Sequence, residues 1–99
     1  MRRVVWSDAA RDDYFAILRY IARDDPDAAE RVVSAIERVG NDLADFATGH
    51  PGRVAGTYEK SVARLPYVIA YALGQDDGTV TILHVIHTSR DWQPGGWPG

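Results

Sequence analysis

The sequence predicts an α+β fold in which a helical hairpin packs on one face of a mainly antiparallel four-stranded sheet. A short β-branched and aromatic segment at residues 2–6 precedes two stretches whose apolar residues recur at helical spacing. Three apolar, β-branched stretches with tight connections then follow between residues 57 and 87. The order β-α-α-β-β-β places both helices against a single sheet.

Length and composition favour one globular domain over residues 1–99, of which about 93–99 form a Gly/Pro-rich tail. Of the 99 residues, 45% are apolar and 25% are charged, which suits a single core. No apolar run approaches the roughly 20 residues that cross a bilayer, and the N-terminal residues lack the apolar stretch of a signal peptide. We therefore expect a cytoplasmic protein that does not contact membranes.

Charge and motif content argue against several function classes. The formal net charge is -3 and the chain has no cysteine, so disulfides and thiolate metal sites are unavailable. Phosphate binders need a dense basic patch, and this chain offers only a modest one. That patch needs folding to bring Arg53, Lys60, Arg64 and Arg90 together. HExxH and DxDxDG patterns are also missing. We expect no metal, no cofactor and no sequence-specific nucleic-acid binding.

Two helices are expected from their capping residues and apolar spacing. Ser7 is a candidate N-cap for a helix that ends near Arg23, and Asp25 with Pro26 starts a second one. The apolar stripe of the second helix consists of Ala29, Val32, Ile36, Val39, Leu43 and Phe46. Gly40 interrupts it at about 1 kcal/mol relative to Ala, which close packing on the first helix could offset. The short link makes the pair an antiparallel hairpin.

The remaining strands are expected after a loop at residues 48–52, in which His50 is given no role. Residues 57–63 suggest a half-exposed strand, whereas residues 66–73 are nearly all apolar and suggest a central one. An Asp77-Gly78 turn then leads into a strand at residues 79–87. The sheet face away from the helices should stay partly open, and function is expected there.

The last strand brings polar and aromatic residues to a strand end, where they can be presented without breaking the core. They are His87, Arg90, Asp91 and Trp92. His87 could transfer protons near neutral pH. With Glu59 as a second proton carrier and Arg64 or Arg90 on the phosphate, it could form a metal-independent endoribonuclease. Alternatively, His87 and Asp91 only cap the strand and hold the tail.

Two histidines and two tryptophans need separate consideration. His84 lies three residues before His87, so the two should point to opposite faces and not share a metal. Trp92 and Trp97 lie in a polar, glycine-rich tail, where large aromatic residues are candidate anchors for a protein interface. The alternative is that Trp92 folds back over the sheet edge.

Short segments from Trp6 to Trp92 together carry a family resemblance. They are Trp6-Ser7 with Ala10, Tyr20-Ile21 before Asp25-Pro26 and Ala29, Gly52-Arg53, Gly56-Thr57 with Glu59, Pro66-Tyr67-Val68-Ile69 with Tyr71, Ile82-Leu83, His87, and Arg90-Asp91-Trp92. No single motif is specific. In order and spacing they resemble the RelE/ParE family of bacterial type II toxin–antitoxin toxins, and more closely its ParE-like branch.

The resemblance implies a small toxin that a cognate antitoxin neutralises within a toxin–antitoxin hetero-oligomer. In this family the antitoxin, here expected to be ParD-like with a ribbon-helix-helix domain, lays a C-terminal segment across the toxin. Exposed parts of the hairpin at Tyr14, Leu18 and Ile21 are expected to receive it. ParE-like members poison DNA gyrase by binding, whereas RelE-like members cleave mRNA on the ribosome.

One departure from the family pattern favours gyrase inhibition. Many relatives carry Arg after the Gly-Thr pair, where this chain has Tyr58. The acidic balance also disfavours a polyanionic target. We expect target binding through Arg64, His87, Arg90, Trp92 and Trp97. The alternatives are an endoribonuclease that uses Glu59, Arg64, His87 and Arg90, or a non-toxic relative that only binds an antitoxin.

Overall fold

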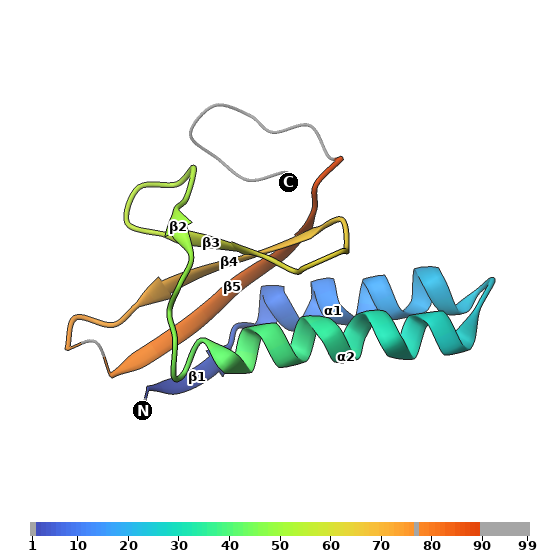
Figure 1. Ribbon diagram of the computed structural model, residues 1–99, viewed down its shortest axis with the longest axis horizontal. Coiled ribbons are helices and arrows are strands. Elements are labelled where there is room, and N and C mark those ends of the chain that lie inside the picture. Colours follow the sequence, from blue (N-terminus) through green and yellow to red (C-terminus); the bar gives the residue numbers. More distant parts are fainter. Residues whose placement is uncertain (1, 77, 90–99) are drawn as a thin grey trace.

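In a computed structural model, which describes residues 2–76 and 78–89, two helices lie on one face of a five-stranded sheet (Figure 1). The elements are β1 (Arg3–Trp6), α1 (Asp8–Ala22), α2 (Pro26–Asp42), β2 (His50–Pro51), β3 (Tyr58–Ser61), β4 (Tyr67–Leu73) and β5 (Thr79–His87). The sheet order is β1-β5-β4-β3-β2, with β1 parallel to β5 and the other pairs antiparallel. The predicted α+β class and helical hairpin are confirmed.

The described sheet has one strand more than predicted. His50 and Pro51 were expected in a loop but form β2, paired with Glu59 and Tyr58 of β3. A two-residue strand that contains proline carries no local β signal. Tertiary contacts hold it instead, since the backbone N–H of Gly49 donates to the Tyr71 hydroxyl at 2.9 Å.

Ser7, between β1 and α1, connects both elements to β5 through hydrogen bonds. Its backbone N–H donates to the carbonyl of Ile82 at 3.0 Å. Its Oγ accepts from the N–H of Ala10 at 3.1 Å and donates to the carbonyl of Leu83 at 3.1 Å. The predicted N-cap is therefore confirmed, and the same side chain also fixes the start of α1 against the last strand.

Asp13, nearly two turns further along α1, fastens the helix to β5 again. Its Oδ2 accepts from the backbone N–H of Val85 at 3.0 Å and lies 3.0 Å from Nδ1 of His84. The pairing of β1 with β5 stops at Ile82. Asp13 therefore supplies an acceptor for an N–H that points away from β4, on the side where no strand of residues 2–76 or 78–89 pairs with Val85.

α2 begins at Pro26 as predicted, with Oδ1 of Asp25 accepting from the N–H of Ala28 at 3.0 Å. Its buried residues are Ala29, Val33, Ile36 and Gly40. The predicted stripe was wrong at its end, because the helix stops at Asp42 and Phe46 is 71% exposed. Gly40 packs on strands and not on α1. A Cβ there would lie 2.6 Å from the Trp6 ring and 2.8 Å from Ile82.

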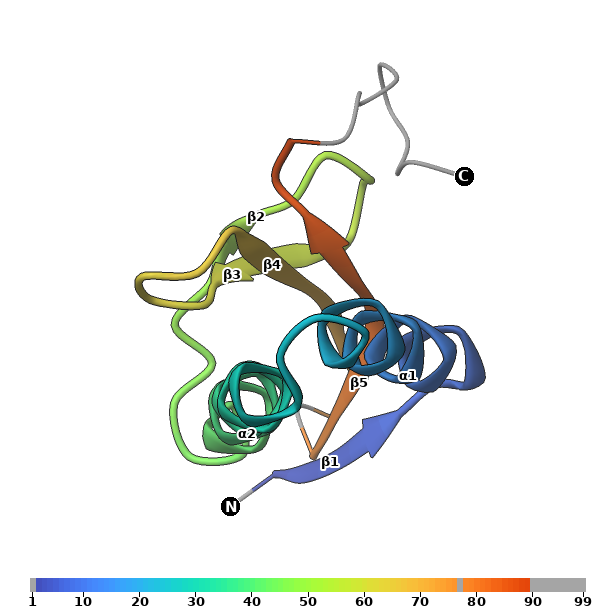
Figure 2. The same ribbon diagram turned by 90° about the vertical axis from the view of Figure 1, so that its right-hand side faces the viewer.

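The main core lies between the sheet and the helices (Figure 2). β4 contributes Tyr67, Ile69 and Tyr71, and β5 contributes Val80, Ile82 and Val85. The reverse face is more covered than predicted, since Glu59, Ala70 and Ile86 are buried there. Within the described residues, no helix has the length and apolar character that a membrane span requires.

Replacing Asp13 with Ala should lower the free energy of unfolding by about 1–3 kcal/mol, because the Val85 N–H loses its acceptor. Urea unfolding followed by circular dichroism measures this. Asp12→Ala is the matched control, since Asp12 is the exposed neighbour on α1 and should change stability by no more than about 0.5 kcal/mol. Equal effects of the two substitutions would show that the Asp13 contacts do not stabilise the fold.

Candidate functional site

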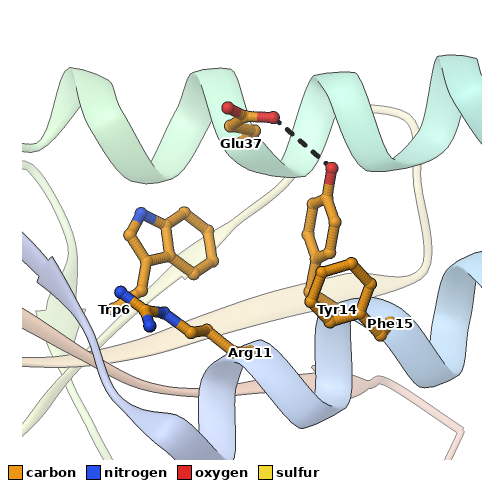
Figure 3. A pocket seen from close by; sticks show the side chains of 5 residues that line it. All are labelled: Trp6, Arg11, Tyr14, Phe15 and Glu37. Atoms are coloured by element: carbon orange, nitrogen blue, oxygen red, sulfur yellow. Dashed lines mark hydrogen bonds between the residues drawn. The ribbon is translucent and has the colours of Figure 1, made fainter.

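Grooves lie on opposite sides of α1 within the described part of the chain. The first, of about 400 Å³, is lined by Trp6, Arg11, Tyr14, Phe15 and Glu37, and we call it the aromatic groove (Figure 3). The second, of about 480 Å³, is lined by Asp13, Ala16, Ile17, Tyr20, Tyr67, Val85, His87 and Ser89, and we call it the His87 groove. The α1 residues of each set follow a separate helical stripe.

The floor of the aromatic groove is a chain of three rings. Trp6 and Tyr14 lie with centroids 6.3 Å apart, and Tyr14 and Phe15 with centroids 5.3 Å apart, both edge to face. The Tyr14 hydroxyl donates to Oε2 of Glu37 at 3.4 Å. Phe15 remains 49% exposed. The groove therefore presents apolar ring surface to solvent, which is what an aromatic or aliphatic anchor of a partner would cover.

Electrostatics keep the Tyr14 hydroxyl protonated. Burial raises the pKa of Tyr14, and so do the charge of Glu37, the hydrogen bond to Glu37 and the charge of Glu30. A phenol whose pKa lies above its ordinary value does not ionise near neutral pH. Tyr14 is therefore fixed as a hydrogen-bond donor to α2 and is not a base.

His87 lies at the open end of the His87 groove. It pairs across the sheet with Tyr67, whose ring it meets edge to face at 5.2 Å. Its Nδ1 accepts from the backbone N–H of Ser89 at 3.1 Å and lies 2.6 Å from Ser89 Oγ. When the ring is neutral, this bond places its proton on Nε2. The neutral ring then offers a donor to a ligand and no free lone pair for general-base catalysis.

The face on which His87 lies corrects an expectation. If side chains alternated strictly along β5, His87 would lie on the other sheet face from Val80 and Ile82, which is the face away from the helices. The register shift at Ala70/Tyr71 leaves Leu83 without a paired residue. As a result, His87 shares the helix side with Val80, Ile82 and Val85. His84 pairs with Ala70, so the two histidines do lie on opposite faces as predicted.

Arg64 lies in the turn between β3 and β4, at the end of the sheet that also carries His87. The N–H of Thr88 donates to the carbonyl of Pro66 at 2.9 Å, which ties the turn to the end of β5. Arg64 is exposed and has a φ of 66°, in the left-handed region that favours glycine. The other predicted target-binding residues, Arg90, Trp92 and Trp97, lie outside the described residues, as does Asp91.

Glu59 does not join His87 in a common site. It is 5% exposed, and its Oε2 accepts from the backbone N–H of Arg53 at 2.9 Å. Glu59 pairs with Ala70, whereas His87 pairs with Tyr67 three residues away on the same strand. The two side chains therefore lie on opposite faces of the sheet. The polar sequence around Glu59 suggested exposure, but the loop after β2 closes over it.

Of the residues predicted to receive an antitoxin, Tyr14 lines the aromatic groove. Leu18 and Ile21 are half-buried and do not line it. The sequence reasoning missed Trp6, Arg11, Phe15 and Glu37. The spacing of Arg11 and Phe15, four residues apart on one helix, could have linked those two. The approach of Glu37 depends on how the hairpin is rotated, for which the sequence has no local signal.

Among residues 2–76 and 78–89, no group of three or more His, Cys, Asp or Glu side chains could hold a metal ion. Between them, the two grooves offer exposed ring surface, an imidazole held by Ser89 and an exposed Arg11.

Comparison with known proteins places the chain in a family. The family model described as the ParE toxin of the type II toxin–antitoxin system parDE matches residues 4–92. The Sinorhizobium fredii protein Y4kP is 40% identical over 92 residues, covering 92% of this chain and 93% of its own. Toxin RelE2 of Caulobacter vibrioides is 35% identical over 91 residues, covering 91% of this chain and 99% of its own.

Solved structures show the same fold. A chain of the chromosomal ParDE system from P. aeruginosa superposes with a TM-score of 0.81 at 22% identity, covering 90% of this chain and 98% of that one. A chain of the toxin–antitoxin complex RelBE2 from Mycobacterium tuberculosis gives a TM-score of 0.59 at 25% identity, covering 87% and 96%. The match to the family model over residues 4–92 and the relative at 40% identity show that the chain belongs to the ParE toxin family of type II toxin–antitoxin systems.

Proposed function

We propose that this toxin inhibits DNA gyrase by binding it, and that a ParD-like ribbon-helix-helix antitoxin neutralises it in the cytoplasm. The observation that carries the binding mode is the separation of Glu59 from His87. A nuclease of the kind considered above needs its proton carriers around one phosphate. Here the carboxylate is buried on one sheet face while the imidazole lies on the other.

The target contact is assigned to Arg64 and His87 at one end of the sheet, and, from the sequence, to Arg90, Trp92 and Trp97. A non-glycine residue in the left-handed region is destabilised by about 1–2 kcal/mol. Such strain tends to persist where the side chain serves a function. The exposed guanidinium of Arg64 is suited to bidentate contact with a carboxylate on a protein partner.

The second candidate is a RelE-type, ribosome-dependent mRNA endonuclease, which the similarity to Toxin RelE2 favours. The experiment that separates the two uses one protein preparation in two assays. Purified toxin is added to gyrase with relaxed plasmid, and to a translating extract with a labelled transcript. Gyrase inhibition with intact transcript supports the proposal. Ribosome-dependent cleavage with normal supercoiling overturns it, and growth unaffected by expression without antitoxin would indicate a non-toxic relative.

Arg64→Gly should separate stability from toxicity. Glycine relieves the strained backbone, so the free energy of unfolding should stay equal or rise by up to about 1 kcal/mol. Growth arrest and gyrase inhibition should both be lost with the guanidinium. Arg38→Ala on α2 removes the same charge from an exposed position and should remain toxic. A fully toxic Arg64→Gly variant would refute a role for Arg64 in target binding.

Deleting residues 92–99 should abolish toxicity while antitoxin binding survives, because the tail tryptophans are assigned to the target and the hairpin to the antitoxin. Growth of an induced culture and a pull-down with tagged antitoxin measure the two properties. Unchanged growth arrest in the truncated protein would remove the tail from the target contact.

A further inference from the structure

Arg11 and Glu37 place opposite charges on the two sides of the aromatic groove. Figure 3 shows Arg11 on the α1 side close to Trp6, and Glu37 on the α2 side beyond the ring of Tyr14. Both residues are exposed. They do not pair with each other. The backbone N–H of Arg11 donates to the carbonyl of Ser7 at 3.0 Å, but its side chain has no hydrogen bond or ion pair with any residue that the structure describes. The groove is therefore charged differently at its two sides and apolar between them.

The net charge of the helical hairpin restricts which kind of segment can occupy the aromatic groove. Residues 8–42, which form the hairpin, contain nine Asp or Glu and five Arg residues and thus have a formal charge of -4. The whole chain has a charge of -3, so the remainder carries +1. A mainly basic segment is attracted to the hairpin. Against that background Arg11 is a local exception, beside which an acidic group is favoured.

We propose that Arg11 and Glu37 read the order of charges along the antitoxin segment that occupies the aromatic groove. An aromatic or branched aliphatic side chain of that segment rests on Trp6, Tyr14 and Phe15. An acidic residue of the segment lies toward Arg11, and basic residues lie toward Glu37. The inference rests on the proposed antitoxin partner and adds which residues of the toxin select it.

The division of roles follows from where each group lies. The rings supply area that is removed from water on binding, which drives affinity. The two charges sit at the exposed rim, where an ion pair adds modest affinity but a like-charge contact opposes binding. A segment with the same anchor and reversed charge order would meet repulsion at both sides. Rim charges of this kind discriminate among partners mainly by rejecting the wrong ones.

The test exchanges the two charges. The double variant R11E/E37R keeps the net charge and the composition, so neither can account for a loss of binding. E37R also removes the acceptor of the Tyr14 hydroxyl, and an antitoxin with exchanged charges separates that effect from the charge arrangement. The probe is the purified protein encoded by the reading frame beside the toxin gene. Isothermal titration at low salt should show binding weakened at least about tenfold, with a smaller loss at high salt. R19E makes the same charge change as R11E on α1, outside the groove, and should bind like the parent.

Three further variants keep the test decisive. F15A removes part of the ring floor and should weaken binding whatever the charge order. If the double variant does not fold, R11Q and E37Q replace it and should each weaken binding. An antitoxin whose complementary charges are exchanged should restore binding to R11E/E37R, which a general loss of structure would not allow.

The outcomes separate this inference from the proposed function. Antitoxin that binds R11E/E37R like the parent, while F15A binds weakly, overturns the reading of charge order and leaves the groove as the site. Parental binding by all variants overturns the groove as well. Altered self-association of the toxin alone would instead place a second copy in the groove, against the proposal. Failure of the parent protein to bind the antitoxin would refute the proposed partner itself.

Discussion

The fastening of α1 along β5 is the constraint on which the rest of this structure depends. β1 covers β5 only as far as Ile82, and beyond that point the backbone of β5 would present an open edge. Ser7 and Asp13 supply the missing partners from the helix itself, at Leu83 and Val85. The same bonds that protect the edge therefore also fix the position and the rotation of α1.

Because α1 is held by polar bonds at an edge, it buries little of its own apolar surface. Ala10 is the buried residue of this helix, while Phe15 and Tyr20 are 49% and 72% exposed. Large exposed aromatic side chains on both sides of one helix exceed what a solitary domain needs. Phe15 and Tyr20 are therefore candidate contacts for a partner. This agrees with membership of a toxin family whose named systems are toxin–antitoxin pairs.

The sequence predicted what depends on local chemistry. Ser7 and Asp25 mark the helix starts because a cap acts within three residues, and the last strand has the predicted bounds of Thr79–His87. The predictions that were wrong concern features that depend on pairing between segments distant in the sequence. The register shift between β4 and β5, which leaves Leu83 without a partner on β4, has no signal within β5 itself. That shift moves His87 to the helix side of the sheet. Glu59 is buried only because a loop from β2 closes over it, and Glu37 reaches the aromatic groove only through the hairpin rotation.

The closeness of the two grooves bears on how neutralisation can work. They are separated by a single helix, whose diameter with side chains is about 10–12 Å. A segment that crosses over α1 follows half of its circumference, about 16–19 Å. An extended chain advances about 3.3 Å per residue, so about five or six residues carry a segment from the aromatic groove over α1 to the His87 groove. An antitoxin anchored on Trp6 and Phe15 can thus cover the end of the sheet that carries Arg64 without any change in the toxin backbone. Under the proposed antitoxin and target contacts, neutralisation by direct occlusion would need no movement of α1, whereas a shift of this helix would first have to break its bonds at Ser7 and Asp13.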